Sequence, residues 1–201
     1  MKTKLLIASR NQKKKNELQQ ILSDSAFALL SLDDLPPLPE VEEDGDTFAE
    51  NAIKKAVTVA RQTGLLTLAD DSGLVVDALQ GEPGIYSARY AGPEANDEKN
   101  NQKLLLALQD TPEQERTARF VCVIALAFPD GRVITVEGTC NGRIDRQSRG
   151  SEGFGYDPLF VPDGYEESFA QLSAQVKHSI SHRGQALELI KPYLQRVNLE
   201  G

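Results

Sequence analysis

Residues 119–137 read RFVCVIALAFPDGRVITVE, and this stretch decides the fold. Both halves are rich in the β-branched and aromatic residues that favour strands, and the turn sequence Pro129-Asp130-Gly131 joins them. The stretch therefore predicts a β-hairpin. Its apolar run, Val121 to Phe128, is the longest in the chain and falls far short of the ~20 residues of a membrane-spanning helix. We expect a protein built around a sheet, with no membrane partner.

Strand and helix patterns alternate on both sides of the hairpin. Thr47 and Glu50 form a capping box at the start of one predicted helix, and Ser168 and Gln171 form a second box. We expect strands at 4–8, 27–31, 65–69 and 74–79, helices at 13–22, 47–64, 96–109, 168–177 and from Ser181 onward with Pro192 bending or shortening the last, and loops at 33–46 and 81–92. The alternation predicts a single α/β domain, residues 1–201, with a mixed twisted β-sheet flanked by helices and two lobes with the active-site cleft between them.

Composition and charge exclude several classes of protein. The chain has 201 residues, 40% hydrophobic and 26% charged, which is typical of a globular protein. Its net charge of −8 gives no general basic surface, so we expect no nucleic-acid partner. Cys122 and Cys140 form no C-x-x-C motif, which argues against zinc and against a disulfide framework. We expect Cys122 to be a small buried hydrophobe and the protein to be cytoplasmic.

Charge is unevenly distributed along the chain. Residues 1–20 carry six basic groups and one acid, whereas residues 33–50 carry eight acids and no base. A basic end beside an acidic loop fits a small polyanion held by cations, with a metal between them. Ordinary solvated surface charge explains the same pattern, so the motifs must decide between the two.

The turn at 9–14 is a candidate phosphate site. Neither G-x-G-x-x-G nor G-x-x-x-x-G-K-[ST] occurs, and two histidines leave little room for a Ser-His-Asp triad. Backbone N–H groups at a helix N-terminus attract anions, and Ser9, Asn11 and Lys14 supply a hydroxyl, an amide and an amine. An ordinary capped helix start with solvated lysines has the same sequence.

The adjacent acids Asp70 and Asp71 follow an apolar strand, where α/β sheets usually hold their sites. A turn at 70–73, with Gly73 at positive φ, accounts for Asp-Ser-Gly but accounts less well for a doubled acid. Two carboxylates suit Mg²⁺ or a water-activating base. The acidic run at 42–46 either adds a metal ligand or is a solvated face.

Lys54 and Lys55 separate on a helical wheel. At about 100° per residue, Lys55 falls beside Phe48 at the edge of the apolar arc, and Lys54 falls on the opposite face. We therefore expect Lys55 to point into a cleft and Lys54 to point into water.

Two later segments carry groups suited to a nucleotide base. Residues 153–158, GFGYDP, set aromatic rings between glycines, and such a loop either lays a ring against a planar base or simply packs. Lys177, His182 and Arg183 place three donors within seven residues. A helix-start cap and surface charge account for them equally well.

Taken together, these segments resemble the inosine triphosphate pyrophosphatase family, the dITP/XTP pyrophosphatases that clear deaminated purine nucleotides. The resemblance runs from Ser9 to Leu189, nearly the whole chain. Its most specific motifs are ADDSGL at 69–74, PGIYSARYAG at 83–92, FGYDP at 154–158 and ISHRG at 180–184.

The resemblance implies a role for each matching residue. Asp71 takes the place of the catalytic base and Lys55 that of the catalytic lysine on the phosphates, while Glu43, Asp70 and Asp71 match the metal ligands. The implied substrate-binding residues are Ser9, Arg10, Asn11, Lys14, Ser72, Phe154, Gly155, Tyr156, Asp157, Lys177, His182 and Arg183. Arg10 stands where the family has glycine, so a positive φ would strain it, and Val176 stands where the family has glutamate.

The activity that the resemblance implies is Mg²⁺-dependent hydrolysis of ITP, dITP and XTP to the monophosphate and pyrophosphate, by a homodimer with Mg²⁺ as cofactor. A nucleotide-sensing module of the same fold, which binds without turnover, is the alternative. Asp71, Glu43 and Lys55 are all present, which favours the enzyme because binding alone requires no water-activating carboxylate.

Overall fold

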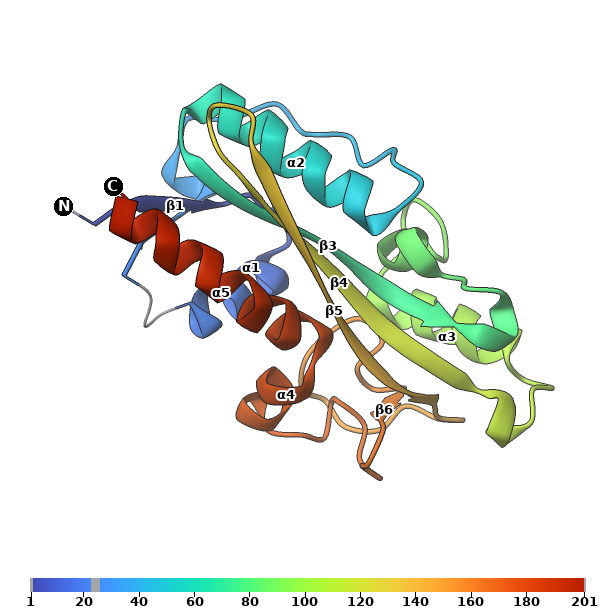
Figure 1. Ribbon diagram of the computed structural model, residues 1–201. Coiled ribbons are helices and arrows are strands. Elements are labelled where there is room, and N and C mark those ends of the chain that lie inside the picture. Colours follow the sequence, from blue (N-terminus) through green and yellow to red (C-terminus); the bar gives the residue numbers. More distant parts are fainter. Residues whose placement is uncertain (1, 23–25, 201) are drawn as a thin grey trace. The chain divides into compact units, whose positions relative to one another are not determined.

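The computed structural model describes residues 2–22 and 26–200, in which strands and helices alternate (Figure 1). The strands are β1 (Lys4–Ile7), β2 (Ala28–Ser31), β3 (Leu66–Val76), β4 (Thr117–Ala127), β5 (Val133–Ile144) and β6 (Phe160–Pro162). The α-helices are α1 (Gln12–Ile21), α2 (Phe48–Thr63), α3 (Asp97–Ala107), α4 (Ala174–Ile180) and α5 (His182–Glu200). Short 3₁₀ helices lie at Leu32–Asp34, Asp77–Leu79, Gly84–Arg89 and Glu113–Glu115.

The strands form one mixed sheet in the order β2-β1-β3-β4-β5-β6. β1 is parallel to β2 and β3, pairing Leu5 with Leu29 and with Leu66, whereas β5 is antiparallel to β6. The predicted hairpin is β4 and β5, two of the long strands of Figure 1, and its turn contains Gly131 with φ +93°. The predicted α/β fold is confirmed, and β6 is a strand that the sequence analysis missed.

The chain divides into two compact units, and the division falls inside β3, β4 and β5. The first unit contains residues 1–71, 122–138 and 183–201, and the second contains residues 72–121 and 139–182. Each unit has hydrophobic clusters of its own.

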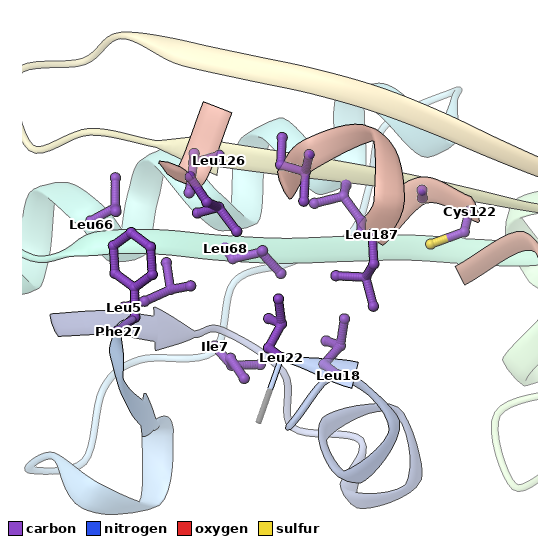
Figure 2. Close-up of a cluster of buried hydrophobic side chains, with 14 residues drawn as sticks. Leu5, Ile7, Leu18, Leu22, Phe27, Leu66, Leu68, Cys122, Leu126 and Leu187 are labelled. Atoms are coloured by element: carbon purple, nitrogen blue, oxygen red, sulfur yellow. The ribbon is translucent and has the colours of Figure 1, made fainter. Parts of the chain in front are cut away.

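Strand residues of the first unit enter two hydrophobic clusters in alternation, because successive side chains of a strand point to opposite faces. Leu68 of β3 packs with Leu18 of α1 and Leu187 of α5 in the cluster that Figure 2 shows. Ala69 packs in the other cluster, with Ala52 of α2. Helices therefore cover both faces of the sheet in this unit.

The core of the second unit is rich in aromatic rings. Leu104 and Leu108 are fully buried in it. The ring of Phe120 lies edge-on to that of Phe160, with centroids 4.7 Å apart, and stacks on that of Phe169 at 5.9 Å. These contacts tie β4 to β6 and to the segment before α4.

Arg116 is a buried cation of the second unit, 2% exposed. Its Nε, Nη1 and Nη2 donate to the carbonyl oxygens of Ile144, Leu108 and Asp145, at 2.8, 2.6 and 2.9 Å. The planar guanidinium thus satisfies three backbone acceptors at once, which suits its fixed arrangement of donors.

The prediction of a turn at 70–73 is wrong. One strand, β3, runs from Leu66 to Val76 through both acids, and Gly73 does not adopt a positive φ. β1 pairs with the start of β3, at residues 66–68, and β4 is the neighbour of β3 on the other side. β3 is also buried along most of its length, so pairing with β4 and burial outweigh the turn preference of Asp-Ser-Gly. The expected loop at 81–92 contains the 3₁₀ helix Gly84–Arg89.

The prediction of a helix over 168–177 is also wrong. The N–H group of Phe169 donates to the carbonyl of Phe160 at 2.9 Å, and the Ser168 hydroxyl donates to a backbone carbonyl at 2.6 Å. These hydrogen bonds join the segment to earlier residues of the chain. The N–H of Phe169 and the hydroxyl of Ser168 are therefore not available to begin a helix. α4 begins instead at Ala174.

The capping box that begins α2 is confirmed. Thr47 Oγ1 accepts from the Glu50 N–H at 3.1 Å, and Glu50 Oε2 accepts from the Thr47 N–H at 3.2 Å. Gly64, with φ +68°, ends α2, while α5 continues past Pro192 to Glu200 and is not shortened by it. Among the helices described here, none has the length and apolarity to cross a membrane.

One cysteine lies in the core of each unit, Cys122 in the first and Cys140 in the second. Burial raises the pKa of both thiols to about 12. The expectation that Cys122 is a small buried hydrophobe is confirmed, since its side chain packs in the cluster of Figure 2.

Candidate active site

Asp70 and Asp71 are consecutive residues of β3, so their side chains point to opposite faces of the sheet. Asp70 shares the face of Leu68, which packs against α1 and α5, and Asp71 shares the face of Ala69, which packs against α2. Both acids are buried. The alternation of the strand therefore gives the two carboxylates different partners.

Asp70 lies in a buried network of opposite charges. Arg183 donates to its Oδ2 from Nη2 at 3.0 Å and from Nε at 3.3 Å, and Lys14 Nζ lies 3.6 Å from the same oxygen. Burial opposes ionisation of this carboxyl, but Lys14 and Arg183 outweigh burial and lower the pKa of Asp70. Asp70 is therefore an ionised group surrounded by cations.

Glu17 belongs to the same network, and sequence analysis missed it. Its Oε2 accepts from Arg183 Nη1 at 2.6 Å. The one available signal was that Glu17 is the single acid of residues 1–20. The second oxygen of Asp70, Oδ1, is buried and has no hydrogen-bond partner among the described residues.

Lys55 lies between two carboxylates on the α2 face. Its Nζ is 3.0 Å from Glu43 Oε1 and 3.9 Å from Asp71 Oδ1, and it donates to the Asp70 carbonyl at 2.7 Å. The Lys55 side chain is 14% exposed, whereas that of Lys54 is 40% exposed. The predicted difference in exposure between the two lysines is confirmed.

Asn51 is a second residue that sequence analysis missed. Its Nδ2 donates to Asp71 Oδ2 at 3.2 Å, and its Oδ1 accepts from the Gly45 N–H at 2.8 Å. The Asn51 amide thus holds both Asp71 and the acidic segment, residues 33–50, which contains Glu43. Burial is the largest influence on Asp71 and raises the pKa of its carboxyl, with Lys55 acting in the opposite direction.

Carboxylates on the α2 face are the donors suited to a divalent cation. Mg²⁺ typically binds through one or two carboxylates and keeps several waters. Glu43 and Asp71, both beside Lys55 Nζ, fit that requirement, whereas Asp70 points to the other face and its Oδ2 is engaged by Arg183. Within residues 2–22 and 26–200, no three His, Cys, Asp or Glu side chains form a metal-binding group. The structure does not bring the three expected ligands together.

The turn between β1 and α1 is a capped helix start. Asn11 Oδ1 accepts from the N–H groups of Lys13 at 3.0 Å and Lys14 at 3.1 Å, and the Ser9 hydroxyl donates to the Asn11 carbonyl at 3.4 Å. Arg10 does not adopt a positive φ, so the expected strain is absent, and its Nη2 donates to a carbonyl of the acidic segment at 2.7 Å.

Asp157 organises the aromatic loop, residues 153–158, in the second unit. Its Oδ2 accepts from the Phe154 N–H at 2.8 Å and from Lys177 Nζ at 2.7 Å, and the Lys177 ammonium lies 5.1 Å from the centre of the Phe154 ring. A Cβ on Gly153 would lie 2.1 Å from Asp157 Oδ2, so the loop requires glycine there. Asp157 thus holds Lys177 in a chain where position 176 is valine.

Three further residues expected to bind the substrate, Tyr156, His182 and Ser72, lie in the second unit. The buried Tyr156 hydroxyl donates to the Ser87 carbonyl at 2.8 Å. The His182 ring stacks on Phe120, with centroids 4.7 Å apart and planes 11° apart. Ser72 is half-buried in β3.

The sequence-predicted residues therefore fall into two groups. The first unit holds Ser9, Arg10, Asn11, Lys14, Glu43, Lys55, Asp70, Asp71 and Arg183, and the second holds Ser72, Phe154, Gly155, Tyr156, Asp157, Lys177 and His182.

Comparison with known proteins gives matches over almost the whole chain. The chain is 52% identical over 194 residues to a dITP/XTP pyrophosphatase of Desulforamulus reducens and 54% identical over 192 residues to one of Geobacter sulfurreducens. Each match covers 96% of this chain and 96% of the relative. A HAM1 protein from Coxiella burnetii has a similar structure, with a TM-score of 0.88 at 42% identity over 96% of this chain and 99% of that one. The Staphylococcus aureus Ham1 protein gives 0.86 at 44% identity, over 96% and 98%. The model of the Ham1 family matches residues 5–193, and with relatives this similar the chain belongs to the Ham1 family.

Proposed function

We propose that this protein is a Mg²⁺-dependent nucleoside triphosphate pyrophosphatase that hydrolyses ITP, dITP and XTP to the monophosphate and pyrophosphate. The observation that carries the proposal is the buried Asp71 carboxylate, held by Asn51 and facing Lys55, which in turn contacts Glu43. A nucleotide-binding module without turnover would need no such carboxylate. The names of the relatives, dITP/XTP pyrophosphatase, support the same activity.

Asp71 is the general base of the proposed reaction. It takes the proton of a water whose oxygen attacks the α-phosphorus; the bond from that phosphorus to the bridging oxygen breaks, and pyrophosphate leaves with the bond's electrons. A buried carboxyl with a raised pKa is better matched to this role at neutral pH than a solvated one. Glu43 and Asp71 would hold Mg²⁺, which neutralises phosphate charge when bound.

Lys55 and Lys14 supply fixed positive charge for the phosphates. Neither needs to reorganise during the reaction, since the carboxylates of Asp71 and Asp70 already orient them. Ser9, Arg10 and Asn11, in the turn before α1, are the proposed neighbours of the phosphates at its N-terminus.

The aromatic loop is the proposed recognition site for the base. Hypoxanthine and xanthine carry a 6-oxo acceptor where adenine carries a 6-amino donor, so buried donors such as Lys177 favour the former. The Phe154 ring, under the Lys177 ammonium, offers a face for the base. Arg183 remains a proposed base-reading residue as well, although the contacts seen here tie it to Asp70 and Glu17.

The testing experiment measures pyrophosphate and orthophosphate release from ITP, dITP, XTP and the four standard triphosphates, with and without Mg²⁺. We expect pyrophosphate from the deaminated purine nucleotides only, and only with Mg²⁺. Orthophosphate as the product would refute the proposal, and tight ITP binding with no release would favour the sensing module. Light scattering would test the homodimer that we also propose, from family membership.

A further inference from the structure

Gly155 separates the two rings of the aromatic loop, and α3 holds both of its backbone polar groups. Its N–H donates to Asp97 Oδ2 at 2.9 Å, and its carbonyl accepts from Asn101 Nδ2 at 2.9 Å. Asp97 and Asn101 are four residues apart, so they share one face of the helix. Gly155 has φ +59°, a left-handed conformation in which the directions of its N–H and carbonyl are set by this clamp.

A third α3 residue, Asn100, holds residues 88–91 in the same way. Its Oδ1 accepts from the Ala91 N–H at 2.8 Å, and its Nδ2 donates to the Ala88 carbonyl at 3.2 Å. The Tyr156 hydroxyl reaches the Ser87 carbonyl in this same stretch. The first turns of α3 therefore fix the aromatic loop directly, through Gly155, and also through the segment that binds Tyr156.

Asn101 carries a cost in stability. Its Oδ1 is buried and has no hydrogen-bond partner among the described residues, which costs free energy. Leucine, which branches at Cγ in the same way, would remove that cost but would leave the Gly155 carbonyl without this donor. What asparagine supplies at this position is the orientation of the Gly155 peptide, and hence of the Phe154 ring that precedes it.

We propose that Asp97 and Asn101 are positioning residues for base recognition: they set the Phe154 ring for stacking through the Gly155 peptide, and they contact no substrate themselves. This inference rests on the proposed function, because it assumes that the aromatic loop receives a purine. It adds Asp97 and Asn101, which lie outside the motifs of the sequence analysis, to the residues that determine the affinity for the base.

Three variants test the role of Asp97. Asp97→Ala removes the acceptor for the Gly155 N–H, whereas Asp97→Asn keeps an acceptor oxygen and loses only the charge. Glu98→Ala is the matched control, since it removes an acid from the same first turn of α3 without a contact to the loop. We expect Asp97→Ala to raise KM for ITP by about tenfold, the effect of losing one hydrogen bond of ordinary net strength, with kcat little changed. Asp97→Asn should restore most of the affinity, and Glu98→Ala should match the wild type.

Asn101→Leu tests the second contact, with Gln102→Leu as its exposed control. We expect a similar rise in KM for ITP from Asn101→Leu. Inorganic tripolyphosphate, which has no base, should inhibit every variant equally. Hydrogen exchange of the 153–157 amides should speed up in Asp97→Ala and Asn101→Leu and stay unchanged in both controls.

The outcomes separate this inference from the proposed function. Faster exchange at 153–157 with an unchanged KM for ITP, or an equal loss of ITP and tripolyphosphate affinity, would overturn the positioning role. Absence of pyrophosphate release by the wild type would instead overturn the proposed function. Calorimetric titration with ITP would then still decide whether the two residues support base binding.

Discussion

Arg183 and Asp70, 113 positions apart in the sequence, form a buried ion pair in which Arg183 Nη2 and Nε both donate to one carboxylate oxygen. Their side chains are 2% and 1% exposed. Because Asp70 lies in the middle of β3 and Arg183 is the second residue of α5, the pair ties the start of α5 to the centre of the sheet in the first unit.

Asp70→Asn should therefore destabilise the protein in a pH-dependent way. Removing one partner of a buried pair costs about 3 kcal/mol or more, since Arg183 is left without its main counter-charge. The folded-state pKa of Asp70 is lowered from 3.8, so its contribution is complete above the unfolded-state pKa and is lost as pH falls through the folded-state value. Urea unfolding should show a large gap between variant and wild type at pH 7 and a smaller gap below pH ~3.8.

Asp44→Asn is the control, because Asp44 forms an exposed pair with Lys54. We expect its urea midpoint to lie close to that of the wild type, because exposed ion pairs contribute little to stability. An Asp70→Asn midpoint equal to that of the wild type at pH 7 would show that the pair contributes no net stability.

Asp71→Asn should remove most turnover and keep nucleotide binding. The amide has the shape of the carboxylate but cannot accept a proton, and loss of a general base typically costs ~10²–10⁴-fold in rate. Single-turnover pyrophosphate release would measure the rate, and calorimetry would measure ITP binding. A kcat near that of the wild type would show that Asp71 is not the base.

Lys55→Met and Lys54→Met form a matched pair on adjacent positions of α2. Lys55 contacts Glu43, Asp71 and the Asp70 carbonyl, so its loss should lower kcat/KM by about 10²-fold, as for other fixed electrostatic donors. Lys54 forms an ion pair with the exposed Asp44, and its loss should change kcat/KM very little. Equal effects of the two substitutions would contradict the assignment.

Arg116→Lys should destabilise the second unit despite conserving charge. An ammonium cannot reach the carbonyls of Leu108, Ile144 and Asp145 with the geometry of the guanidinium, and each buried acceptor left unpaired costs about 1–3 kcal/mol. Thermal unfolding would measure the loss. Arg119→Lys is the control, because Arg119 is partly exposed and pairs with Asp77 at the surface; a similar loss from both would refute a special role for Arg116.

Local sequence patterns predicted those parts of the fold that depend on neighbouring residues. The Thr47 capping box, the hairpin turn at Gly131 and the wheel positions of Lys54 and Lys55 all follow from residues within one element. The predictions of an Asp-Ser-Gly turn and of a helix from Ser168 failed because partners distant in sequence compete for those segments. The competing partner is β4 for the former and Phe160 for the latter.

The same limit applies to the candidate site. The motifs identified which acidic and basic residues are candidates for the site, but not which of them contact one another. Asn51 and Glu17 escaped notice because an asparagine inside a helix and a lone glutamate have no distinctive spacing. The separate surroundings of Asp70 and Asp71 became clear only once β3 proved continuous, since strand alternation and a turn direct consecutive side chains differently.

The reactivity of the two buried cysteines reports local opening of the protein core. A thiol reacts as the thiolate, and with a pKa near 12 neither Cys122 nor Cys140 supplies much thiolate while its core is closed. Alkylation at neutral pH therefore waits for the surrounding core to open. Because one cysteine lies in each unit, the alkylation rates of the two cysteine-containing peptides would measure the opening rates of the two cores separately, without any engineered label.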